Sequence, residues 1–243
     1  MPVWGRLLTA MVTPFDASGG VDLVRASQLA RNLLANGSAG LVICGTTGES
    51  PTLSHDEKLA LLAAVIRAVG GDKVIAGTGS NDTAASIALS REAEALGASG
   101  LLLIAPYYNR PDQEGLYRHF RAVAESVQLP IILYNHPPRT GVSIAAGTLR
   151  RLTADCANIV ALKDSSGSLD TACEFLAHAT DDFILYSGND TLTLPIMAVG
   201  GYGVISVASH VAGPLLKDLI DLAQAGNFSA ARKIHFSCWD LMN

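Results

Sequence analysis

Short apolar runs alternate with longer stretches of helical periodicity along the whole chain. The short runs are apolar at consecutive positions rather than at every second one, which is typical of parallel strands whose two faces are both covered. The pattern predicts strands at residues 7–12, 40–44, 73–76, 100–104, 131–134, 159–162, 183–186 and 203–206.

Apolar residues recur at helical spacing between the predicted strands and after the last of them. Ser54 followed by Glu57 has the composition of a capping box at the start of one such stretch. Gly70 and Gly97 stand where helix C-caps are expected. The pattern predicts helices at residues 23–35, 55–69, 83–96, 113–127, 144–152, 169–177, 191–199 and 214–225.

Strand and helix alternate without a break in composition or a long linker. Two architectures fit such alternation, an open doubly wound sheet and a closed (β/α)8 barrel. A GxGxxG motif after the first strand would favour the open sheet, but Thr-Pro-Phe-Asp stands there, at 13–16. The sequence therefore predicts an α/β fold, a (β/α)8 TIM barrel over residues 1–226, with the start of a further helical region at 227–243.

The composition excludes several functional classes. The chain has 243 residues, of which 49% are hydrophobic and 16% charged, so it is not a disordered protein. Its formal net charge of −5 offers no basic footprint for nucleic acid or an anionic membrane. No apolar run approaches the roughly 20 residues that span a bilayer, and residues 1–13 have the pattern of a first strand rather than of a signal peptide.

The cysteines and histidines do not stand at metal-ligand spacing. The six histidines form no HxH or HxxxH pair, so no metal site is expected, and His136 is interpreted as a loop contact. The four cysteines lie apart, in or beside apolar runs, which predicts reduced packing residues of a cytoplasmic protein. They are Cys44, Cys156, Cys173 and Cys238.

Lys163 stands directly after the apolar run at 159–162. The active sites of (β/α)8 barrels form at the carboxyl ends of the strands, where polar residues of this chain also collect. Desolvation at such a position disfavours the charged ammonium, and a neutral amine can form a Schiff base with a carbonyl. The alternative is a surface lysine paired with Asp164. Tyr134, at the end of the neighbouring strand, and the Thr46–Thr47 pair favour the catalytic interpretation.

Four motifs carry a family resemblance. They are Gly-Thr-Thr-Gly-Glu at 45–49, Pro-Tyr-Tyr-Asn-Arg-Pro at 106–111, the segment from Tyr134 to Gly141 with its Arg-Thr-Gly end, and Lys163. In this order and spacing they resemble the dihydrodipicolinate synthases, a branch of the pyruvate-dependent class I aldolases. The resemblance extends over essentially the whole chain. It implies a lyase of lysine and diaminopimelate biosynthesis that condenses pyruvate with L-aspartate 4-semialdehyde.

The resemblance also implies catalytic roles. Lys163 forms the Schiff base with pyruvate, and no external cofactor is needed. Tyr134 donates and accepts protons at the reacting carbons. Thr46 relays protons together with Tyr108, which reaches in from a neighbouring subunit. The implied assembly is a homo-oligomer, a dimer or a tetramer.

Substrate-binding positions follow from the same resemblance. Thr47 and Ile205 contact pyruvate, Thr47 through its carboxylate, and Gly188 is a further binding position. Arg139 clamps the carboxylate of the semialdehyde, a role that suits its planar, bidentate guanidinium.

Two other functions remain open at this point. The Lys-Asp-Ser-Ser-Gly segment at 163–167 is closer to sister enzymes acting on sugar acids, such as N-acetylneuraminate lyase or 2-keto-3-deoxy sugar acid aldolases and dehydratases. Arg139, Thr140 and Gly141 favour aspartate semialdehyde instead. A catalytically silent barrel that acts as a binding module is the non-enzymatic alternative, and the intact set of reactive side chains disfavours it.

The family resemblance has a regulatory implication as well. Feedback-sensitive members bind free L-lysine at positions that match Ser50, His55, Lys58, Asn81, Ala85 and Tyr107. Sensitive enzymes tend to carry histidine at the position of Lys58 and glutamate at that of Ala85. The sequence therefore predicts weak inhibition by L-lysine, or none. Members of the family also continue into a small helical C-terminal domain, of which residues 227–243 are expected to be the first part.

Overall fold

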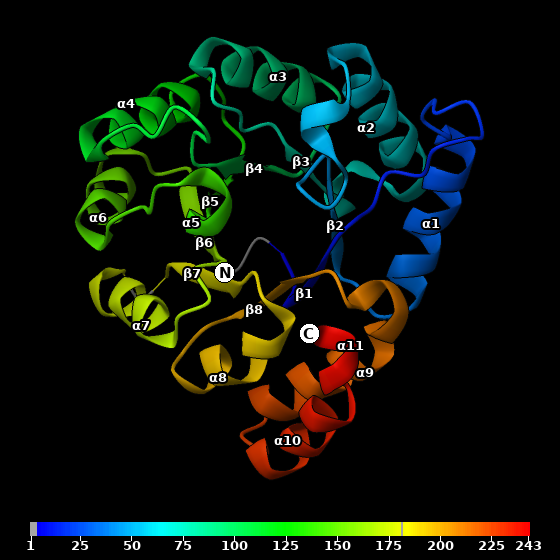
Figure 1. Cartoon of the computed structure of the whole chain (residues 1–243), viewed down its shortest axis with the longest axis vertical. Helices are drawn as coiled ribbons and strands as arrows, with labels where there is room; N and C mark the ends of the chain where they lie inside the picture. Colours follow the sequence, from blue (N-terminus) through cyan, green and yellow to red (C-terminus); the bar gives the residue numbers. More distant parts are fainter. Residues whose placement is uncertain (1–3, 181) are drawn as a thin grey trace.

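Eight parallel strands form a closed barrel in the order of the sequence (Figure 1). The computed structural model describes residues 4–180 and 182–243. The predicted architecture is confirmed, and every predicted strand is present. The strands are β1 (Leu7–Ala10), β2 (Gly40–Ile43), β3 (Val74–Gly77), β4 (Gly100–Ile104), β5 (Ile131–Asn135), β6 (Ile159–Asp164), β7 (Ile184–Ser187) and β8 (Gly203–Ser206).

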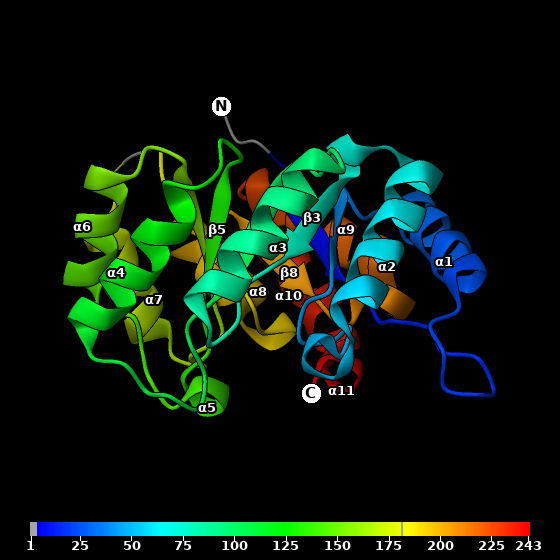
Figure 2. The ribbon, with the colours of Figure 1, turned by 90° about the horizontal axis from the view of Figure 1, so that it is seen from above.

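Helices surround this barrel as an outer ring (Figures 1 and 2). The capping box of Ser54 and Glu57 begins α2, and Gly70 and Gly97 follow helix ends with φ of 90° and 88°, as predicted. The helices are α1 (Leu23–Ala35), α2 (His55–Val69), α3 (Thr83–Ala95), α4 (Gln113–Ala124), α5 (Pro137–Thr140), α6 (Ala146–Asp155), α7 (Leu169–His178), α8 (Thr193–Ala198), α9 (Ser209–Gln224), α10 (Phe228–Ser237) and α11 (Trp239–Met242).

The strands are apolar on both faces because each face has its own core. Alternate side chains point into the barrel, where Val42, Ile75 and Ile132 belong to one buried cluster. The intervening positions, such as Leu41 and Leu133, pack outward against the helices in a second, larger cluster. This double burial explains why the sequence shows continuous apolar runs.

Some element ends differ from the prediction for identifiable reasons. β6 continues through Asp164, since Lys163 and Asp164 pair in register with residues of both neighbouring strands, so Lys163 lies within the strand rather than after it. α6 begins at Ala146 instead of residue 144, because the backbone N–H of Ile144 donates to Asn135 Oδ1 at 3.0 Å. α9 begins before Pro214, with non-helical dihedral angles at Ala212 marking a kink.

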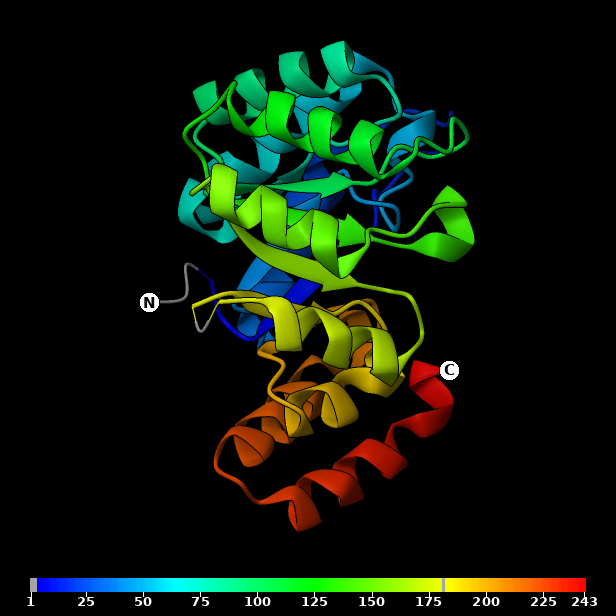
Figure 3. The same ribbon diagram turned by 90° about the vertical axis from the view of Figure 1, so that its left-hand side faces the viewer.

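α5 lies outside the predicted helices, whereas α10 and α11 lie in the helical region that was expected at 227–243. α5 is a single turn that starts at Pro137, too short for its periodicity to be visible. α10 packs against α9, where Ala231 joins a buried cluster with Leu216 and Leu219 (Figure 3). The domain boundary at residue 226 stays a prediction. Within the described part of the chain, no helix combines the length and apolar character needed to cross a membrane.

Candidate active site

Lys163 and Tyr134 stand side by side on β6 and β5. The two residues are register partners, and Lys163 Nζ lies 4.4 Å from the centroid of the Tyr134 ring. Both side chains are buried, at 5% and 4% exposure. The alternative of a surface lysine paired with Asp164 is wrong. Successive strand residues point to opposite faces, and Asp164 instead accepts hydrogen bonds from Asn135 and Ser166.

A second tyrosine is also in register with Lys163, but its hydroxyl is hydrogen-bonded within the protein. Tyr186 lies opposite Lys163 on β7 and is fully buried. Its hydroxyl donates to the carbonyl of Gly5 at 2.9 Å, and burial raises its pKa well above the ordinary value. Of the two tyrosines, Tyr134 is therefore the one with a phenol available to a substrate.

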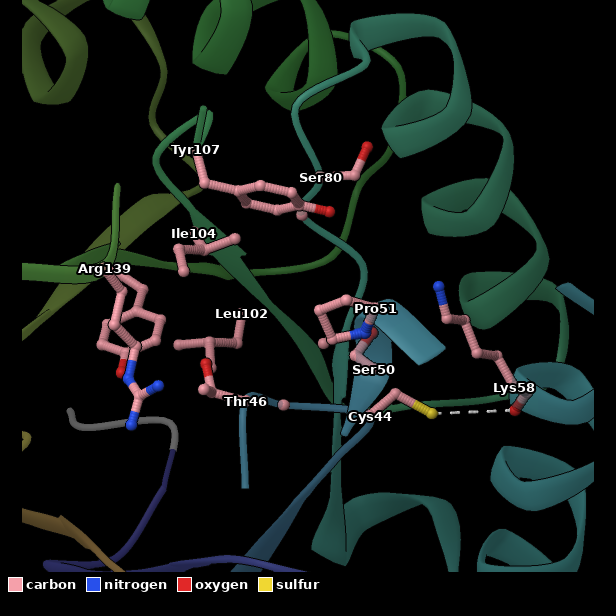
Figure 4. A pocket seen from close by; sticks show the side chains of 14 residues that line it. Cys44, Thr46, Ser50, Pro51, Lys58, Ser80, Leu102, Ile104, Tyr107 and Arg139 are labelled. Carbon is pink, nitrogen blue, oxygen red and sulfur yellow. Dashed lines mark hydrogen bonds between the residues drawn. The ribbon is translucent and has the colours of Figure 1, made fainter. Parts of the chain in front are cut away.

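A pocket of about 250 Å³ opens at the carboxyl ends of β2 to β5 (Figure 4). Its lining combines polar side chains and turn backbone with apolar residues such as Leu102. Among the lining residues, two are cationic, Lys58 and Arg139, and none is acidic. The lining residues are Cys44, Gly45, Thr46, Ser50, Pro51, Lys58, Gly77, Gly79, Ser80, Leu102, Ile104, Tyr107, Tyr134 and Arg139.

Arg139 reaches the pocket from α5, which follows β5. Its Nε donates to Nε2 of His136 at 3.1 Å. Burial, together with the positive charges of Arg139 and Lys163, lowers the pKa of His136 to about 4. His136 is therefore neutral near pH 7, so it accepts a hydrogen bond from the guanidinium and does not compete with it for an anion. The interpretation of His136 as a loop contact agrees with this geometry.

The other predicted residues divide between the pocket and the surface. Thr46 and Tyr107 line the pocket, whereas Thr47 is half-buried in the turn beside it and is not among the lining residues. Tyr108 is 88% exposed and has a left-handed backbone with φ of 69°. Consecutive tyrosines thus face different surroundings. The role of Tyr108 at the site of a neighbouring subunit stays a prediction.

Gly188 and Ile205 complete the barrel mouth on the side of β7 and β8. Ile205 is fully buried in the inner cluster that also holds Tyr134. Gly188 follows β7, and its N–H donates to the carbonyl of Asp164 at 2.7 Å. A Cβ at this position would lie 2.9 Å from Lys163 Cε and would overlap the hydroxyl of Ser165. Only glycine leaves room for the lysine side chain here.

Ser165 belongs to this cluster although sequence reasoning did not single it out. The signal was present, because strand residues two positions apart share a face and Ser165 stands two residues after Lys163. As for metals, no group of three or more potential ligands occurs among the residues that the structure describes.

Comparisons with known proteins agree with this geometry. The model of the dihydrodipicolinate synthetase family matches residues 4–243. The chain is 58% identical over 233 residues to the 4-hydroxy-tetrahydrodipicolinate synthase of Moorella thermoacetica, covering 96% of this chain and 80% of that protein. The crystal structure of dihydrodipicolinate synthase from Aquifex aeolicus superposes with a TM-score of 0.96 at 43% identity, over 98% of this chain and 81% of that one. The enzyme from Cyanidioschyzon merolae, solved with lysine bound, superposes with a TM-score of 0.97 at 44% identity, over 100% and 83% of the two chains.

Proposed function

The chain belongs to the dihydrodipicolinate synthetase family, and we propose that it condenses pyruvate with L-aspartate 4-semialdehyde to 4-hydroxy-tetrahydrodipicolinate through a Schiff base on Lys163. It is a lyase of lysine and diaminopimelate biosynthesis and needs no external cofactor. The observation that carries the site assignment is the buried Lys163 in register with Tyr134 at the end of the barrel. The neighbouring pocket has only cationic charged side chains, which suits two substrates that both carry carboxylates.

The first half of the reaction attaches pyruvate to the protein. The neutral amine of Lys163 attacks C2 of pyruvate, and the resulting carbinolamine loses water to form an iminium. Thr46 and Thr47, in the turn after β2, hold the pyruvate carboxylate and help to move protons. Tyr134 then takes a proton from the pyruvate methyl group, so that the electron pair of the C–H bond forms an enamine.

The second half adds the semialdehyde. Arg139 at the mouth of the pocket binds its carboxylate, which places the aldehyde carbon next to the enamine. The enamine carbon forms a bond to the aldehyde carbon, and the aldehyde oxygen takes up a proton to become a hydroxyl. The amino group of the semialdehyde portion then attacks the iminium carbon, closes the ring and releases Lys163.

Tyr108 contributes to this chemistry across a subunit boundary in our proposal. A tyrosine that is 88% exposed beside the site, on backbone with positive φ, is held outward rather than packed into its own chain. In a homo-oligomer, a dimer or tetramer, such a side chain reaches the Thr46 hydroxyl of the partner and completes the proton relay.

The alternative functions are not favoured. The curated relatives that match at 50–58% identity over nearly the whole chain are named for the synthase reaction, not for a sugar-acid lyase. A silent barrel has no need of a buried lysine beside a phenol.

The response of the protein to free L-lysine depends on the charges around the pocket. In this chain Lys58 lines the pocket on the side away from Arg139 (Figure 4), which we propose weakens the binding of a second cation.

Reductive trapping tests the assignment. Pyruvate plus borohydride should attach a reduced adduct to Lys163, which peptide mass mapping locates, and addition of the semialdehyde should yield product. Lys163→Ala should abolish both signals, while Lys73→Ala, an exposed lysine at the opposite end of the barrel, should retain both. Labelling that persists in Lys163→Ala would move the Schiff base elsewhere. Turnover of a sugar acid without turnover of the semialdehyde would replace the proposed reaction.

A further inference from the structure

Ser165 occupies the inward-facing position nearest the barrel mouth on β6 and its continuation. Ala161 belongs to the inner cluster and Leu162 to the outer one, which sets the alternation of the strand. Lys163 therefore faces inward, Asp164 faces outward, and Ser165 faces inward again. The backbone N–H of Ser165 donates to the carbonyl of Asn135 at 2.8 Å, so this alternation continues past the last residue of the strand.

The hydroxyl of Ser165 is buried without a hydrogen-bond partner. The residue is 5% exposed, and its Oγ has no hydrogen-bond partner among the described residues. Nearly all buried polar atoms in folded proteins are paired, because an unpaired one forfeits its bonds to water. A serine that carries this cost on the inner face of a barrel mouth indicates a partner that is bound during the reaction.

The surroundings of the hydroxyl identify where that partner lies. The Ser165 hydroxyl and Lys163 Cε both approach the space above Gly188 Cα, which a Cβ would fill. The Tyr134 ring covers Lys163 Nζ from the direction of β5. Ser165 thus flanks Lys163 on the side of β7, at a level closer to the mouth.

We propose that Ser165 contacts the acceptor substrate, its Oγ–H donating a hydrogen bond to the aldehyde oxygen while the carbon–carbon bond forms. This assignment rests on the proposed function. Pyruvate is bound to Lys163 deeper in the barrel, so an aldehyde arriving from the mouth brings its carbonyl oxygen to the level of Ser165. Of the inward side chains of β6, Ser165 is the one at that level.

The hydrogen bond acts on charge that develops during bond formation. As the enamine carbon attacks, the π electrons of the aldehyde C=O move to its oxygen, and the enamine nitrogen becomes an iminium. The oxygen gains a proton from the Tyr134 relay and becomes the product hydroxyl. Ser165 keeps its own proton throughout, and its donor dipole stabilises the partial negative charge on the oxygen.

Ser165→Ala is the decisive variant, with Ser99→Ala as its matched control. The Ser99 hydroxyl donates to the carbonyl of Val74 and accepts from Trp4 at the opposite end of the barrel. Removing the unpaired Ser165 hydroxyl should leave Tm unchanged or raised, whereas Ser99→Ala should lower Tm and leave the kinetics unchanged. In Ser165→Ala, kcat/KM for the semialdehyde should fall about tenfold, the effect of one neutral hydrogen bond. The rate of borohydride-trapped adduct formation with pyruvate alone should stay at the wild-type value.

Three results would overturn the proposal. If Ser165→Ala kept the wild-type kcat/KM for the semialdehyde, Ser165 would not contact the aldehyde oxygen. If adduct formation with pyruvate alone slowed by the same factor, Ser165 would act on Schiff-base formation at Lys163 rather than on the aldehyde. A loss of Tm comparable to that of Ser99→Ala would make the hydroxyl structural. Failure of the proposed function is distinguishable, because the wild-type protein itself would then give no product from pyruvate and semialdehyde.

Discussion

Asn135 and Asp164 form a buried hydrogen-bonded pair on the outer face of β5 and β6, with Asn135 Nδ2 donating to Asp164 Oδ1 at 2.8 Å. The same amide accepts a hydrogen bond through Oδ1 from the backbone N–H of Ile144, at 3.0 Å. Asn135 therefore joins the strand that carries Lys163 to the segment that follows Arg139. Burial raises the pKa of Asp164 above its ordinary value, and the hydrogen bonds from Ser166 and Asn135 oppose this shift by stabilising the carboxylate.

Asn135→Ala should therefore weaken both stability and substrate binding. The variant removes one hydrogen-bond donor to the buried Asp164 carboxyl group and leaves the backbone N–H of Ile144 without its acceptor. We therefore expect a loss of about 1–3 kcal/mol in the free energy of unfolding. KM for the semialdehyde should rise more than KM for pyruvate, since the Arg139 segment loses its anchor. Denaturant titration and steady-state kinetics measure the two effects.

Asn158→Ala is the control for this substitution. Asn158 Nδ2 donates to backbone carbonyls, including that of Ala124 at 3.0 Å, at the amino end of β6. This variant should lose stability with unchanged KM values. An equal change of both KM values in Asn135→Ala would show that the amide does not position Arg139.

Arg139→Ala should discriminate between the two substrates directly. Hydrogen bonds to charged groups contribute about 1.5–3 kcal/mol, which corresponds to a rise in KM for the semialdehyde of about 10- to 100-fold. KM for pyruvate should change little, because pyruvate is held by Lys163 and the turn after β2. Arg118→Ala, an exposed arginine on α4, should behave like the wild type. A larger rise in KM for pyruvate would contradict the assignment.

The sequence predicted most of the fold because its signals are local. Parallel strands buried on both faces read as continuous apolar runs, and the capping box before α2 identifies that helix start from two residues. The placement of Lys163 and Tyr134 at one end of the barrel followed from the same topology.

What escaped prediction depends on contacts between distant residues. The Asn135–Asp164 pair spans 29 positions, and the later start of α6 follows from the hydrogen bond of the Ile144 N–H to the same asparagine. The alternation of strand residues places Ser165 on the same face as Lys163, but only the structure shows that its hydroxyl is buried without a partner. Tyr107 and Tyr108 have the same side chain, and only the backbone conformation decides that one lines the pocket and the other is exposed.

Stability should fall as the pH decreases below about 6.5, and His119 should account for part of the loss. Burial lowers the pKa of His119 to about 4, although Asp82 opposes the shift. Between these values the unfolded chain binds a proton that the folded chain does not. Stability from this group is thus complete above pH 6.5 and lost as the pH falls to about 4, by at most about 3 kcal/mol.

Urea titrations at pH 7.5 and 4.5 measure this contribution. His119→Leu should lose less stability between the two pH values than the wild-type protein, since it has no imidazole to protonate. His178→Gln, which changes an exposed histidine, should keep the wild-type difference. If His119→Leu shows the same difference as the wild type, the buried imidazole does not contribute to the pH dependence.

Free L-lysine should inhibit the condensation weakly or not at all. Its ammonium group needs an anionic partner, but the pocket side that could receive it carries Lys58, and Ala85 on the first turn of α3 offers neither charge nor a polar group. Two like charges a few Å apart repel by a few kcal/mol at an effective dielectric constant of about 20, before salt screening. Half-inhibition of the wild-type rate at submillimolar L-lysine would contradict this reasoning.

The double variant Lys58→His, Ala85→Glu removes the repulsion and supplies a carboxylate, so it should be inhibited at lower L-lysine concentrations than the wild type. Ala84→Glu, one residue earlier on the exposed surface of α3, adds the same charge with Lys58 still in place and should leave the inhibition unchanged.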